Sequence, residues 1–126
     1  MTDFGAERIA EALVANNVLV SLDLGANRIG RDGAVSLAEM LMVNTSIQDV
    51  NLDGNRVEDE GCIAIATAIV NAPVKSLRGI GIARNRVLGA VGHRTGNVEM
   101  SGLLAIARAV AATPTIERLR VSVLTL

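Results

Sequence analysis

Apolar positions along the chain recur with a period of 28 residues. One set of recurring positions is spaced four residues apart within each repeat. It comprises Gly5, Gly33 and Gly61, then Ile9, Leu37 and Ile65, then Leu13, Leu41 and Ile69. A second set comprises Leu22, Leu24, Asn27 and Ile29, which return as Val50, Leu52, Asn55 and Val57. A fixed period of this length is typical of a solenoid, in which one supersecondary unit stacks on the next.

Each unit contains a strand pattern followed by a helix pattern. Polar and apolar residues alternate over 21–24, which predicts a strand with one buried face. Gly33, Leu37 and Leu41 are spaced four apart, which predicts an amphipathic helix. We expect helices near 5–16, 33–44, 60–71 and 100–112, and strands near 20–24, 48–52, 78–82 and 117–123. Parallel strands joined by helices cross over in a right-handed sense, so the predicted fold is an α/β right-handed solenoid with about four parallel strands on its concave side and about four helices on its convex side.

An asparagine follows each of the first three predicted strands, at Asn27, Asn55 and Asn85. A buried amide there can bond the backbone of its own turn and of the neighbouring repeat, which would otherwise be unpaired. We therefore expect the three side chains to form a ladder. Residues 86–99 lengthen the third unit and contain three glycines without periodicity, which predicts a loop insertion.

Composition narrows the possible functions. A chain of 126 residues is expected to form one domain, 1–126. Its net charge is −1 and Phe4 is its single aromatic residue, which disfavours nucleic acid and membrane surfaces as partners. The single cysteine, Cys62, and the lack of a long apolar run or a signal-peptide pattern favour a cytoplasmic protein.

Four features resemble metal-binding, phosphate-binding or catalytic sites, but the repeat explains the presence of their residues better. Residues 49–60 match a calcium loop, but their acidic and amide side chains alternate with the apolar residues of a strand. Residues 78–83 resemble a glycine-rich phosphate loop but belong to the third strand. His93 lies in the insertion without ligand-type neighbours, and Cys62 occupies a packing position shared with Ala6 and Ala34. We therefore predict no catalytic residue, metal site or cofactor.

The outward positions of the four strands form the candidate partner-binding surface. The face is expected to be acidic at one end, bare at Gly79 and Gly81 in the middle, and basic at the other end. Such a graded face would orient a partner of opposite polarity. Replacing Asp49 and Asp53 with lysine is therefore expected to weaken partner binding and to leave melting unchanged. The candidate residues are Ser21, Asp23, Asp49, Asn51, Asp53, Arg84, Arg118 and Arg120.

The C-terminal strand and the outward surfaces of the helices are two places where the chain could associate with another chain. The segment 121–126 is an apolar strand at an open sheet edge, and uncovered edges pair with other chains. Either the sequence is part of a longer repeat protein, or a partner or second copy covers this edge. Apolar residues predicted to lie off the inward helix face offer a second surface for self-association, unless adjacent repeats cover them. These residues are Val35, Met40, Met42, Ile63, Val70 and Leu104.

The repeat unit resembles a known family. Residues 22–34, LDLGANRIGRDGA, are similar to the leucine-rich repeats of the ribonuclease-inhibitor-like class. That resemblance implies a horseshoe with its helices outside, a protein-binding function and no cofactor. Residues 38–44, AEMLMVN, followed by VNL at 50–52, resemble the C-terminal domain of tropomodulins and leiomodins. The insertion ending in GNVEM at 96–100 resembles a long insertion in that domain.

Tropomodulins cap actin filament pointed ends, so this resemblance implies actin as a candidate partner. The main prediction is a non-enzymatic module that binds another protein. One alternative is a tropomodulin-like regulator of actin filaments, or a fragment of one. The other alternative is a structural, self-associating segment of a larger repeat receptor.

Overall fold

A computed structural model gives the arrangement of the chain and describes residues 1–85 and 101–121. Helices and strands alternate along these residues. The elements in chain order are α1 (Asp3–Leu13), β1 (Ser21–Asp23), α2 (Arg31–Val43), β2 (Asp49–Asn51), α3 (Glu58–Asn71), β3 (Gly79–Gly81), α4 (Ser101–Ala111) and β4 (Arg118–Arg120).

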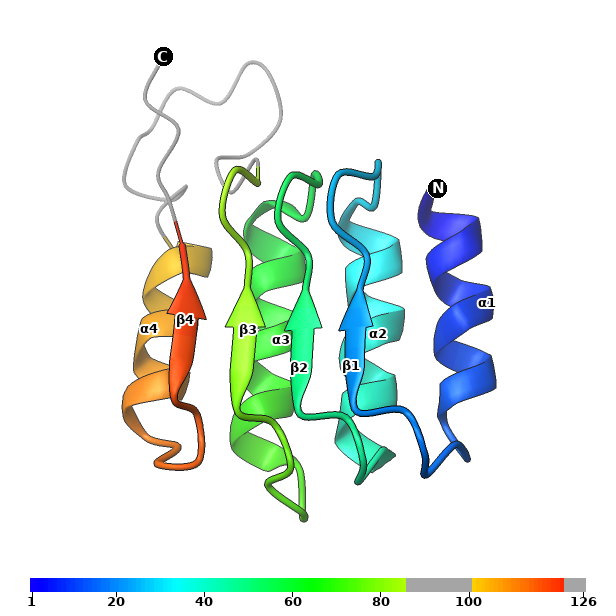
Figure 1. The fold of residues 1–126 in the computed structure, drawn as a ribbon. Coiled ribbons are helices and arrows are strands. Elements are labelled where there is room, and N and C mark those ends of the chain that lie inside the picture. The colour runs from blue at the N-terminus through cyan, green and yellow to red at the C-terminus, as the bar shows by residue number, and fades with distance from the viewer. Residues whose placement is uncertain (86–100, 122–126) are drawn as a thin grey trace.

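The strands form one parallel sheet in the order β1-β2-β3-β4. All four arrows point the same way in Figure 1, and the helices lie together behind them. Each connection from strand to helix to strand is right-handed, as is usual for this topology. The predicted α/β solenoid with parallel strands on one side and helices on the other is therefore confirmed. The sheet face that carries no helices is called the open face below.

The core lies between the sheet and the helix layer. Leu22 pairs with Val50 and Val50 with Ile80 in the register of the sheet, and each side chain is at least nine-tenths buried. The helices contribute the matching layer with Leu37 and Ile65, which are equally buried. Residues one period apart therefore stack in rows, and each row removes apolar surface from water.

Neighbouring helices approach closely at glycine positions. A β-carbon at Gly33 would lie 3.0 Å from the β-carbon of Ala6, and one at Gly61 would lie 3.0 Å from that of Ala34. Cys62 is equivalent to Ala6 and Ala34, and it lies beside the glycine at the start of α4. These small residues therefore bring one helix close to the next.

Several details differ from the sequence-based expectations. The strands are three residues long because the chain leaves the sheet at each asparagine turn. α2 begins at Arg31 and α3 at Glu58, two residues before the predicted starts. Met40 is buried at 1% exposure, as expected if adjacent repeats cover it, whereas Ile63, Val70 and Leu104 are exposed. The predicted insertion 86–99, His93 and the chain beyond residue 121 lie outside the described residues.

Candidate functional site

Asn55 joins two successive coils at the carboxyl ends of the strands. Its Nδ2 donates to the carbonyl oxygens of Leu24 and Leu52 at 2.9 and 3.0 Å. Its Oδ1 accepts from the backbone N–H of Ile29 at 3.0 Å. The side chain is 4% exposed, so water does not replace these bonds. One amide thus satisfies backbone groups on both coils, as buried polar groups require.

Asn85 and Asn27 repeat this arrangement on either side of Asn55. The Nδ2 of Asn85 donates to the carbonyl oxygens of Leu52 and Ala83, and its Oδ1 accepts from a backbone N–H of the preceding coil. The Oδ1 of Asn27 accepts instead from the amino group of Met1 at 3.0 Å. Asn27 is only half-buried, whereas Asn85 is completely buried. The bonds between coils therefore run from Met1 through all three turns.

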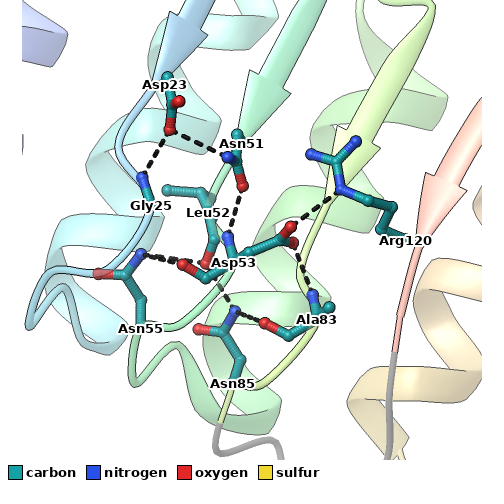
Figure 2. A network of polar contacts seen from close by, with 9 residues as sticks. All are labelled: Asp23, Gly25, Asn51, Leu52, Asp53, Asn55, Ala83, Asn85 and Arg120. Atoms are coloured by element: carbon teal, nitrogen blue, oxygen red, sulfur yellow. Dashed lines mark hydrogen bonds and ion pairs between the residues drawn. The ribbon is translucent and has the colours of Figure 1, made fainter.

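A second polar network begins on the open face (Figure 2). The carboxylate of Asp23 accepts from the backbone N–H of Gly25 and from Nδ2 of Asn51, both at 2.9 Å. The Oδ1 of Asn51 accepts from the backbone N–H of Asp53 at 2.8 Å. The Oδ1 of Asp53 then accepts from the backbone N–H of Ala83 at 2.8 Å. These bonds connect three successive strands through their outward side chains.

Two arginines of β4 extend the network across β3 to β2. The Nε of Arg120 donates to Oδ2 of Asp53 at 2.9 Å, and the guanidinium of Arg118 pairs with Asp49. The hydrogen bond and the charge of Asp49 raise the pKa of Arg118 above its ordinary value. Each arginine therefore pairs with a carboxylate two strands away.

The glycines of β3 leave room for these ion pairs. A β-carbon at Gly81 would lie 2.7 Å from Oδ1 of Asp53 and 2.9 Å from Cζ of Arg120. A β-carbon at Gly79 would lie 3.1 Å from Nε of Arg118. Gly79 and Gly81 are buried because arginine side chains cover their outer side, whereas Ile80 is buried in the core. The expected bare middle of the open face is therefore wrong.

The predicted partner-binding residues do not form one graded surface. Ser21, Asp23, Arg118 and Arg120 are exposed on the open face, and Asp49 and Asn51 are half-buried there. Arg84 is exposed in the turn after β3. The structure joins the acidic and basic ends of the predicted gradient as neighbouring ion pairs, which cancels most of the expected polarity.

Asp53 has a structural role that the sequence did not reveal. It is 8% exposed, and its carboxylate accepts both from Ala83 N–H and from Arg120. A lysine there would leave the N–H unpaired and place a cation beside the guanidinium. The expectation that lysines at 49 and 53 leave melting unchanged therefore fails at Asp53.

A row of asparagines at the opposite end of the sheet was also missed. Nδ2 of Asn44 donates to the carbonyl oxygens of Leu13 and Asn16 at 2.9 Å, and its Oδ1 accepts from the backbone N–H groups of Ser46 and Ile47. Asn16 closes its own turn in the same manner. The signal was present, because Asn16 and Asn44 are separated by the same 28 residues as the rest of the repeat.

The described side chains offer little chemistry for catalysis. Cys62 is completely buried, and burial raises the pKa of its thiol to about 12, so it stays protonated at neutral pH. Glu60 of the calcium-like motif pairs with Arg31 at 3.0 Å. Within residues 1–85 and 101–121, no group of three or more His, Cys, Asp or Glu side chains is placed to hold a metal ion.

The repeat is also recognised by comparison with known families. The Leucine Rich repeat family model matches residues 15–38 and again residues 43–66, in register with the first coils of the solenoid. Repeats of the leucine-rich type are therefore present in the first part of this chain. No curated protein sequence matches the chain. In the part of the chain that the structure describes, no helix is long and apolar enough to cross a membrane.

Two solved structures share the arrangement of this chain. Leiomodin-1 Actin-Binding Site 2 has a TM-score of 0.79 and 25% sequence identity, and the match covers 99% of this chain. The tropomodulin C-terminal domain of Caenorhabditis elegans has a TM-score of 0.74, and the match covers the whole chain at 15% identity. This chain spans 66% of the leiomodin chain and 70% of the tropomodulin chain. The resemblance expected from the sequence is confirmed.

Proposed function

We propose that this chain is a non-enzymatic module that binds another protein on the open face of its sheet. The observation that carries the proposal is that the helices of the described residues all lie on one face of the sheet, and none of them lies on the other (Figure 1). Repeat proteins of this kind commonly use such a surface for binding. A cytoplasmic location remains part of this proposal and fits the single, buried, protonated cysteine.

The contact area is expected to centre on β1 and β2. The arginines of β4 are held in ion pairs with β2, whereas Ser21 is exposed and Asp23 presents a carboxylate at the start of the sheet. A partner can therefore contact this end without first breaking an ion pair. Desolvating paired charges would reduce affinity at the other end.

We expect the combined variant Ser21→Arg with Asp23→Asn to weaken partner binding by about tenfold or more, because it changes shape and charge at the centre of the contact. The measurement is affinity capture from cell extract followed by titration of the captured protein. The free energy of unfolding should change little, since both residues are exposed.

The matched control is Glu39→Arg, which makes the same change in net charge on an exposed position of α2. It should retain the partner that the open-face variant loses. Equal loss with both variants would show that net charge, rather than the open face, governs the capture. Equal retention with both would place the contact elsewhere.

Actin is the second candidate, and the similarity to Leiomodin-1 Actin-Binding Site 2 supports it. Under this proposal the chain is a tropomodulin-like binder of actin filaments or part of one. Its four coils would supply the repeat surface, and the long connection between β3 and α4 would match the insertion expected from the sequence. Self-association as part of a larger repeat receptor stays a prediction that no contact in the structure tests.

We expect the chain to co-sediment with actin filaments and to slow elongation at pointed ends if the second candidate is correct. The open-face variant should reduce both effects, while Glu39→Arg should not. If the chain sediments with filaments no more than an unrelated protein does, actin is excluded as the partner. The general protein-binding proposal then stands.

A further inference from the structure

Three arginines from successive coils lie along the carboxyl edge of the sheet. Arg28 and Arg56 each follow a ladder asparagine, and Arg84 precedes the third one. All three are exposed. By residue number they belong to the segments that follow β1, β2 and β3. We call these residues the arginine row. Its first two members were missed in the sequence, although the repeated Asn-Arg pair marks them.

Unlike the arginines of the open face, Arg28 and Arg56 form no ion pair with a carboxylate of the described residues. Among the described residues no carboxylate lies within ion-pair distance of either one, whereas Arg118 and Arg120 are both paired. They occupy equivalent positions on adjacent coils, whose backbones lie about 5 Å apart in a parallel sheet. Both positive charges therefore lie on the same edge of the sheet, where one acidic segment can be attracted by both.

The backbone at Arg84 adds a second observation. Its φ is 53°, in the left-handed region, and its equivalents in the earlier turns are Ala26 at 57° and Gly54 at 72°. Glycine adopts this conformation without strain, and arginine does not. The turn therefore does not require an arginine, and the strained position brings a third cation to the same edge. Backbone strain of this kind concentrates at functional positions.

We propose that the arginine row docks an acidic segment of a partner protein, running across the coils along this edge. The inference deepens the proposed protein-binding function and rests on it. Arginine binds carboxylates through two parallel hydrogen bonds, so separate glutamate or aspartate side chains can each seat on one guanidinium. The row would then act beside the open face and would fix the partner's orientation.

The surroundings of the row favour discrete carboxylates over a continuous polyanion. Arg56 lines a shallow cleft with Asp3, Asp32 and Glu58, behind the row at the helix starts. Asp3 is engaged by the backbone N–H of Gly30, and Asp32 by an arginine of its own helix. These carboxylates would repel the dense charge of a nucleic acid or an anionic bilayer. A peptide that places its side chains only on the row avoids them.

The test is fluorescence anisotropy with a short glutamate-rich peptide, and with the same peptide carrying glutamine, at low and at physiological salt. We expect binding of the glutamate peptide alone, weakened by salt. The variant Arg28→Gln with Arg56→Gln should weaken it about threefold to tenfold. Arg84→Gly should also weaken binding while keeping the turn, because the equivalent position in the second coil is Gly54.

The control variant Arg8→Gln with Arg108→Gln removes two exposed charges from the helix layer and should bind as wild type. Thermal unfolding of all variants checks that each is folded. The proposal is overturned if the control loses as much binding as the row variants, or if single-stranded oligonucleotides or phosphatidylserine vesicles bind more tightly than the peptide. If the peptide fails to bind but the open-face variant still loses the captured partner, the arginine row is excluded and the proposed function stands.

Discussion

Replacing Asn55 with alanine is expected to lower the free energy of unfolding by about 3 kcal/mol. The substitution removes both donors and the acceptor of a buried amide. It leaves the N–H of Ile29 and the carbonyls of Leu24 and Leu52 without these partners in a site that excludes water. Urea unfolding followed by circular dichroism would measure the loss.

Asn27→Ala is the matched comparison, with an expected loss of about 1 kcal/mol. Asn27 is half-buried, and its Oδ1 bonds the exposed amino group of Met1, which water can solvate instead. The two variants remove the same side chain from equivalent turns. Equal losses would show that the ladder does not bind one coil to the next and that each asparagine only closes its own turn.

Gly61→Ala is expected to destabilise the protein by about 1 to 3 kcal/mol. In an exposed helix the same change would stabilise by up to about 1 kcal/mol. Here the new methyl group would meet the β-carbon of Ala34 at 3.0 Å and the side chain of Val57. Helices α2 and α3 would have to separate, which disturbs the packing on both sides.

Gly5→Ala supplies the control, because Gly5 occupies the equivalent position on α1. The three atoms nearest to its added methyl group would all belong to the side chain of Met1, which can move aside. We expect this variant to gain about 0.5 to 1 kcal/mol. Opposite signs at Gly5 and Gly61 would identify helix-to-helix contact as the reason for the glycines. A gain at both positions would contradict that explanation.

The 28-residue period predicted the fold well because it specifies which residues lie side by side in adjacent coils. Residues such as Leu22 and Val50, one period apart, pair directly in the sheet, so the sequence also predicted their register. The asparagine turns followed from the same repetition. Short-range rules were sufficient here, because every coil buries the same apolar positions against the adjacent coils.

The candidate site was harder to predict because it depends on side-chain reach. The sequence placed Arg120 and Asp53 at opposite ends of a charge gradient, and only the structure shows that one long side chain spans the intervening strand. The glycines of β3 look like empty positions in the sequence, but they accommodate those side chains. The burial of Asp53 likewise follows from neighbours 30 and 67 residues away.

The arginines of β4 also change how this solenoid is expected to come apart. In most repeat proteins each unit touches only the next one, so an end unit can unravel alone. Here Arg118 pairs with Asp49 of β2 and Arg120 pairs with Asp53 just after β2, past the intervening unit. Fraying of the final strand must therefore break contacts with the second unit as well as the third. We therefore expect the last three units to open together rather than one at a time.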